Sequence, residues 1–307
     1  MTPSQSELRK YLDPRTLARV SSLELRARQI VEGLMTGMHR SPHQGSSVEF
    51  SQHRQYTSGD DIRHLDWKVF GRSDRLYIKQ YQEETNLPIV LVVDASESMG
   101  FGSVPTDSPR NWTKFDHATS IAAALAYMGI HQQDAVGLAI FDQVLSRYFP
   151  PHSTSGQWRH VVTELQAVPK WNKTDTGKVL EQIAEKVSHR SLIIVISDFF
   201  DSIESLVRGL RHLRYRRHEV VCMQVLDPQE IEFPFDDITM FKGMEELGEL
   251  LTEPRGLRTA YLEQFKTFTD AMRKSCRAMK VDFHQFNTKD PLDAALSNFL
   301  SMRAATI

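Results

Sequence analysis

The chain has 307 residues, of which 40% are apolar and 25% are charged, and its formal net charge is −2. This balance is typical of a folded globular protein and excludes an intrinsically disordered chain. Because phosphate backbones require a basic excess, nucleic acid is not an expected partner of this near-neutral chain.

The first 86 residues are predicted to form an accessory segment of helix and short strands. Asp13-Pro14 opens a helix that runs to about residue 38, because proline suits the first helical turn. Residues 47–56 and 75–82 have the composition of strands and bracket a turn-rich stretch. This segment holds too little apolar material for a core of its own, so we expect it to pack on the next domain or extend from it.

From residue 87 onward, short apolar runs alternate with amphipathic stretches. Continuous apolar runs are typical of strands buried on both faces, as parallel sheets require. Strand and helix alternation implies right-handed crossovers, and hence a three-layer, doubly wound, mostly parallel α/β sheet over residues 87–307, preceded by the accessory α+β segment 1–86. The predicted strands are 88–93, 136–141, 192–197, 220–226 and 280–286, and the predicted helices are 115–130, 176–187, 203–213, 258–279 and 291–302.

An aspartate follows each of the first four of these strands: Asp94, Asp142, Asp198 and Asp227. In open sheets, ligands bind at the carboxyl ends of the strands where the strand order reverses. An aspartate after a strand is also a common cap for the following helix. We favour that structural role for Asp142 and Asp227, which leaves Asp94 and Asp198 as candidate site residues.

The sequence Asp-x-Ser-x-Ser begins at Asp94 and places the hydroxyls of Ser96 and Ser98 on the same tight loop. Such hard oxygen ligands suit Mg²⁺, and also Mn²⁺ or Ca²⁺. The Thr174 hydroxyl, just before a predicted helix, can join them, and Asp198 can reach the ion directly or through water. The motif is weak alone, and the alternative is that Ser96, Ser98 and Thr174 only cap helices.

The charge of this predicted metal site indicates its chemistry. One or two carboxylates and three neutral hydroxyls leave a dication undercompensated, so that an acidic side chain of a partner can displace bound water. No general base or nucleophile is evident beside the site. We therefore predict a non-enzymatic module that recognises an acidic group on a partner protein.

Asp94 to Ser98, Thr174 and Asp198 resemble the metal-ion-dependent adhesion site of von Willebrand factor A domains. The strings Gly59-Asp60-Asp61-Ile62-Arg63 and Leu65-Asp66-Trp67 resemble the bacterial family called domain of unknown function fifty-eight. This resemblance covers about residues 40–200. It implies a von Willebrand factor A-like fold and a chaperone-like adaptor of a MoxR-type AAA+ ATPase in protein assembly or maturation. One departure is Lys173, where such domains usually have glycine.

The main enzymatic alternative is an Mg-dependent phosphohydrolase of the haloacid dehalogenase type. Such enzymes need a second aspartate two residues after the nucleophile, where this chain has Ser96. A hydroxyl cannot replace a carboxylic acid as general acid. The basic run 208–218 leaves two interpretations open, namely a solvated helix end and a docking patch.

Two cysteines, Cys222 and Cys276, lie in apolar or helical contexts and predict buried thiols. No run reaches the ~18 apolar residues of a membrane-spanning helix. Residues 1–19 also lack the apolar segment of a signal peptide. We therefore expect a cytoplasmic protein without a membrane span.

Overall fold

The computed structural model describes residues 14–17, 22–38, 50–57, 65–73, 75–81, 87–106, 110–167, 175–242 and 249–304. The chain divides into two compact units, one of residues 41–86 and one of residues 1–40 together with 87–307. A boundary at residue 86, as expected from the sequence, would place helix α3 (Leu23–Met38) in the accessory segment. In the structure, α3 belongs to the larger unit.

A six-stranded sheet in the order β10-β7-β6-β3-β4-β5 forms the centre of the larger unit. All neighbouring strands are parallel except β4 and β5, which pair antiparallel. The predicted mostly parallel α/β sheet is therefore confirmed. Its strands are β3 (Ile89–Asp94), β4 (Val136–Phe141), β5 (Leu145–His152), β6 (Leu192–Ser197), β7 (Glu219–Leu226) and β10 (Asp282–Asn287).

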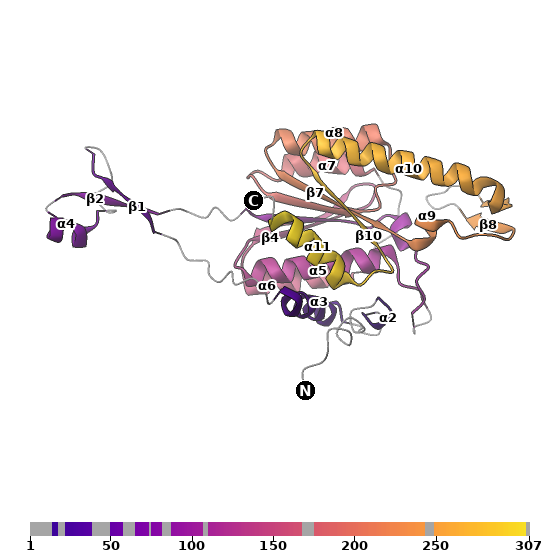
Figure 1. Ribbon diagram of the computed structural model, residues 1–307, viewed down its shortest axis with the longest axis horizontal. Coiled ribbons are helices and arrows are strands. Elements are labelled where there is room, and N and C mark those ends of the chain that lie inside the picture. Colours follow the sequence, from indigo (N-terminus) through magenta and orange to yellow (C-terminus); the bar gives the residue numbers. More distant parts are fainter. Residues whose placement is uncertain are drawn as a thin grey trace. The chain divides into compact units, whose positions relative to one another are not determined.

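Helices cover both faces of this sheet (Figure 1). Side chains of β3 alternate between the two cores: Leu91 and Val93 face one, and Val90 and Val92 face the other. The first core is closed by α5 (Lys114–His131), α6 (Ser155–Gln166) and α11 (Leu292–Ala304). The second is closed by α7 (Thr176–Lys186), α8 (Ile203–Tyr215) and α10 (Pro254–Ala278).

Helix α3 packs outside the first helical layer, against α5, α6 and α11 (Figure 1). The predicted helix from Pro14 to about residue 38 appears as α2 (Pro14–Leu17) and α3, with residues 18–21 outside the described part. Helix α3 buries an apolar stripe with helical spacing, which explains why it joins this unit. The stripe consists of Leu23, Ala27, Ile30, Val31 and Leu34.

The smaller unit contains an antiparallel pair of strands, β1 (Phe50–Gln55) and β2 (Tyr77–Tyr81), and helix α4 (Trp67–Ser73). Asp66 begins this helix, because its Oδ1 accepts hydrogen bonds from the backbone N–H of Lys68 at 2.9 Å and of Val69 at 3.2 Å. The two strands agree with the predicted ones. Residues 58–64, which hold most of the family-like string, lie outside the described residues.

Helices α7 and α8 approach each other closely at two glycines. A Cβ atom on Gly177 would overlap Ser205 of α8, and one on Gly209 would lie 2.5 Å from the carbonyl oxygen of Gly177. No side chain larger than hydrogen fits between the two backbones here. The contact therefore sets how closely α7 packs against α8.

The strand order reverses between β3 and β6. After β3 the chain adds β4 on one side, and it later returns to add β6 on the other. The carboxyl ends of β3 and β6 carry Asp94 and Asp198, so the fold places both predicted site residues at the edge where such sheets bind ligands.

Candidate functional site

Asp94, the last residue of β3, is fully buried, and backbone and hydroxyl donors hold its carboxylate. Its Oδ1 accepts a hydrogen bond from the N–H of Ser96 at 2.8 Å, and its Oδ2 accepts one from the hydroxyl of Ser197 at 2.6 Å. The first bond turns the chain into the short 3-10 helix η2 (Glu97–Gly100). The second ties the end of β3 to the end of β6.

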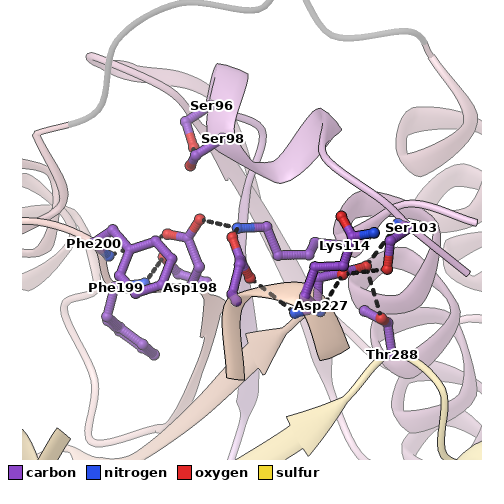
Figure 2. A network of polar contacts seen from close by, with 12 residues as sticks. Ser96, Ser98, Ser103, Lys114, Asp198, Phe199, Phe200, Asp227 and Thr288 are labelled. Atoms are coloured by element: carbon purple, nitrogen blue, oxygen red, sulfur yellow. Dashed lines mark hydrogen bonds and ion pairs between the residues drawn. The ribbon is translucent and has the colours of Figure 1, made fainter. Parts of the chain in front are cut away.

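The hydroxyls of Ser96 and Ser98 lie together on this loop, with 3.1 Å between their Oγ atoms. Figure 2 shows both side chains pointing from the loop toward the side where Asp198 lies. Neither hydroxyl is the side-chain cap of a helix in the structure, since η2 has no side-chain cap hydrogen bond. The sequence motif therefore brings three oxygen-bearing side chains to one place.

The fourth predicted ligand, Thr174, lies outside the described residues, as does Lys173. The residues just after it begin helix α7. Asp175 caps α7 by accepting a hydrogen bond from the N–H of Lys178 at 3.2 Å. The N–H of Thr176 donates to Asp201 at 2.8 Å.

Asp198 follows β6 and takes part in a buried ion-pair network that the sequence did not predict (Figure 2). Its Oδ2 lies 2.7 Å from Nζ of Lys114, and the same Nζ lies 2.6 Å from Oε1 of Glu230 in α9 (Pro228–Glu232). Its Oδ1 accepts a hydrogen bond from the N–H of Phe200 at 3.1 Å. Both oxygens of Asp198 thus have protein partners.

Lys114 is the first residue of α5 and is fully buried, with its Nζ 5.0 Å from the centroid of the Phe200 ring. Burial lowers the pKa of Lys114, but the negative charges of Asp198 and Glu230 outweigh burial and raise it above its ordinary value. The ammonium is therefore a permanent internal counter-ion of these two carboxylates. The one sequence signal was a lysine directly before a predicted helix, where a cation opposes the helix dipole.

Asp94 lacks such a counter-ion among the described residues. Burial, and then repulsion from Asp198, raise the pKa of Asp94 to about 7, although hydrogen bonds from Ser197 and Ser96 lower it in part. A cation beside Asp94 would relieve both of these effects. The carboxylate and the two neighbouring hydroxyls are the hard oxygen donors that Mg²⁺, Mn²⁺ and Ca²⁺ accept.

The residues present therefore fit a divalent cation held by Asp94, Ser96 and Ser98, while Asp198 is engaged by Lys114. Among the described residues, no three or more histidines, cysteines, aspartates or glutamates come together as a metal site. Binding at this place would consequently depend on hydroxyl oxygens and water, which leaves a dication open to further acidic ligands.

The other two strand-end aspartates have structural roles. Asp227 caps α9 by accepting from the N–H of Gln229 at 2.9 Å, and it also accepts from the N–H of Ser103 at 2.8 Å and the hydroxyl of Thr288 at 3.3 Å (Figure 2). Its predicted capping role is confirmed. The expected helix cap at Asp142 is wrong, because Asp142 precedes the antiparallel strand β5 and not a helix. Its Oδ1 instead supports a turn by accepting hydrogen bonds from the N–H of Val144 at 3.2 Å and the hydroxyl of Ser146 at 3.1 Å.

The fold and these contacts define a class: α/β proteins with a mostly parallel sheet and an oxygen-rich site at the switch point of the strand order. The family described as "Protein of unknown function DUF58" matches residues 52–270, and the chain belongs to this family. The predicted resemblance is confirmed.

Two mycobacterial relatives, Uncharacterized protein Mb1516 of Mycobacterium bovis and Uncharacterized protein Rv1480 of Mycobacterium tuberculosis, are each 29% identical over 226 residues, 72% of this chain and 68% of theirs. Among solved structures, the conserved hypothetical protein BatB from Bacteroides thetaiotaomicron matches with a TM-score of 0.46 and 16% identity over 71% of this chain and 99% of its own. An aerotolerance-related membrane protein from Bacteroides fragilis matches with a TM-score of 0.45 and 16% identity over 72% of this chain and 100% of its own. In the described part of the present chain, no helix combines the length and apolar character needed to span a membrane.

Proposed function

We propose that this protein is a non-enzymatic interaction module, in which a divalent cation held by Asp94, Ser96 and Ser98 recognises an acidic side chain of a partner protein. The observation that carries the proposal is the pair of hydroxyls 3.1 Å apart on the loop that follows a buried carboxylate, for which the described residues provide no counter-ion. The bound cation would supply electrostatic attraction for an incoming carboxylate. Thr174 would complete the ligand set, and Asp198 would contribute through water.

The chemistry of the neighbouring groups supports a binding role and not a catalytic one. Lys114 stays protonated between two carboxylates, so it is not available as a nucleophile or a general base. The alternative phosphohydrolase would need a carboxylic acid at Ser96, where the structure has a hydroxyl bonded to Ser98.

An apolar rim beside the site suits a protein partner. Phe200 lies two residues after Asp198 and is 39% exposed. Its ring contacts those of Phe265 and Phe268 in α10, with centroids 6.4 and 6.2 Å away. Aromatic side chains are enriched at the centre of protein interfaces, so the exposed Phe200 suits contact with a protein partner.

A MoxR-type AAA+ ATPase in the cytoplasm is the proposed partner, because the family resemblance suggests it. The direct test measures binding of the purified ATPase to this protein by biolayer interferometry, in Mg²⁺ and in chelator. Asp94→Asn should weaken binding in Mg²⁺ at least tenfold, a loss of about 1.4 kcal/mol. In chelator, wild type and variant should bind equally weakly.

Asp134→Asn is the matched control, because it removes one carboxylate just before β4, at the opposite end of the sheet. Its affinity for the ATPase should equal that of the wild type. Binding that ignores both chelator and Asp94→Asn would contradict the proposal. Mg²⁺-dependent hydrolysis of an aryl phosphate that disappears in Asp94→Asn would instead favour the phosphohydrolase.

A further inference from the structure

We infer that the amino-terminal edge of the sheet carries a second binding site, a basic pocket for a polyphosphate anion. A cavity of about 870 Å³ opens where β7 and β10 begin. It lies at the opposite end of the strands from Asp94, because Glu219 at the start of β7 pairs with the start of β6, while Asp198 follows the end of β6. Six cationic side chains line this cavity: Arg190, Arg214, Arg217, Arg273, Arg277 and Lys280.

Two helices end at this basic pocket in the same way. Helix α8 leads into β7 and helix α10 leads into β10, and these strands are parallel neighbours. Each helix closes with the pair of backbone bonds of a Schellman motif, which satisfies its last carbonyl groups. In α8 the N–H groups of Arg217 and His218 donate to the carbonyls of Arg214 (2.9 Å) and Leu213 (3.2 Å), and in α10 those of Lys280 and Val281 donate to Arg277 (3.2 Å) and Cys276 (2.9 Å).

The residue that follows the cap of each helix is a cation in a left-handed backbone conformation, Arg217 with φ of 65° and Lys280 with φ of 55°. Glycine is the usual residue at this position, because a side chain is strained there. The helix carbonyls are already bonded, so they do not require a cation. Helix α5 ends in the same way at the uncharged Gln133, with φ of 65°, so Arg217 and Lys280 are distinguished by being cations that line the same pocket.

Half of the cations remain available for a ligand. Arg214 is fixed between the two helix ends, because its Nε donates to the carbonyl of Met279 at 3.1 Å and its NH1 group to that of His218 at 2.6 Å. Arg190 pairs with Glu219 at 3.0 Å, and Arg273 donates to Gln285 at 2.7 Å. In the described part of the chain, the remaining three have no ion pair or side-chain hydrogen bond: Arg217, Arg277 and Lys280.

The charge of the pocket defines the class of its ligand. Six cations and two carboxylates, Glu219 and Asp282, give 6 − 2 = +4, in a chain whose net charge is −2. The two helix ends contribute about half a negative charge each, which still leaves a surplus of about three positive charges. A guanidinium group can bind phosphate with two parallel N–H···O hydrogen bonds. A chain of phosphates therefore matches this density of positive charge better than single carboxylates do.

The size of the pocket favours a small molecule. Its volume of about 870 Å³ falls within the range of about 300–1,000 Å³ that is common for small-molecule sites. Phe283 of β10, half-buried, also lines it and offers an apolar surface. The shared chemistry is a polyphosphate chain, which both inorganic tripolyphosphate and a nucleoside triphosphate present.

Isothermal titration calorimetry of the full chain with tripolyphosphate, and separately with ATP, tests this site. The double variant Arg217→Gly, Lys280→Gly removes two cations and relieves two strained positions. It should raise the dissociation constant for both probes about 100-fold, at about tenfold for each charge-assisted contact. Its melting temperature should match or exceed that of the wild type, because glycine suits both positions.

The matched control is Arg208→Gln, Arg211→Gln, which removes two exposed cations from α8 outside the pocket. It should change affinity less than about threefold. Tighter binding of ATP than of tripolyphosphate would support a nucleotide site, and equal binding a site for the phosphate chain alone.

Three results would overturn the inference. The first is no binding of either probe at millimolar concentration, including the case in which a polyglutamate peptide binds instead. The second is a folded glycine variant that binds like the wild type. The third is an equal loss of affinity in the control, which would indicate unspecific attraction.

Discussion

Replacement of Lys114 by methionine should strongly destabilise the protein, because it removes the shared counter-ion of two buried carboxylates. The side chains of Asp198 and Glu230 are 3% and 16% exposed, and each lies within 2.7 Å of Nζ. At an effective dielectric constant of about 20, each contact is worth about 6 kcal/mol before the desolvation of the charges is subtracted. Loss of one partner from such a pair typically lowers the free energy of unfolding by about 3–5 kcal/mol.

Urea denaturation followed by circular dichroism, at neutral pH in chelator, measures this loss. The second variant combines Lys114→Met with Glu230→Gln, which removes one of the two uncompensated charges. It should recover part of the lost stability, because the amide is less costly to bury than a carboxylate. A loss below about 1 kcal/mol in Lys114→Met would refute the reasoning, since exposed ion pairs contribute no more than that.

Two further predictions concern packing and pH. Gly177→Ala should lower the free energy of unfolding by about 1–3 kcal/mol, because the added methyl group overlaps α8. Gly156→Ala in α6, where nothing lies within 4 Å of the added Cβ, should instead raise it by about 0.5–1 kcal/mol in the same denaturation assay. Burial lowers the pKa of His117 from 6.5 to about 3, so the unfolded chain takes up a proton before the folded protein does. The contribution of His117 to stability should therefore fall as the pH drops from about 6.5 toward 3, by up to about 5 kcal/mol, while Asp94, whose pKa is raised to about 7, contributes in the opposite direction. His117→Gln keeps an acceptor for Trp112 and should flatten this dependence in denaturation curves recorded across the range; an unchanged slope would contradict the assignment.

The parts of the fold that the sequence predicted well are those in which local pattern and burial agree. Residues 192–197 were predicted with the bounds that β6 has, because a strand buried on both faces is apolar throughout. Strand β5 was missed, because it is a half-exposed edge strand that contains Arg147 and the pair Pro150-Pro151. Helix α6 and the hairpin of β8 (Thr239–Lys242) and β9 (Glu249–Thr252) were also not predicted.

The residues of the candidate site also differ in how well the sequence predicted them. Asp94, Ser96 and Ser98 follow one another within five residues, so their spacing reveals that they share a loop. Lys114 meets its partners across 84 and 116 residues, and the predicted helix began one residue after it. Only tertiary packing brings such groups together, and a lysine near a helix start otherwise indicates an exposed side chain.

The basic pocket shows how the fold can distinguish between two interpretations of one sequence pattern. The run 208–218 alone was compatible with a solvated helix end. The second set of cations, Arg277 and Lys280, lies about 60 residues later, and only the pairing of β7 with β10 places both sets around one cavity.

The position of α3 has a consequence for synthesis of the chain. This helix leaves the ribosome before residues 41–86, whereas its partner α5 begins only at Lys114. At ~5–20 residues per second, its apolar stripe stays uncovered for about 4–15 seconds. During that interval the exposed apolar stripe of α3 can be bound by a holdase chaperone. An mRNA truncated before the codons of α5 would yield a product prone to aggregation.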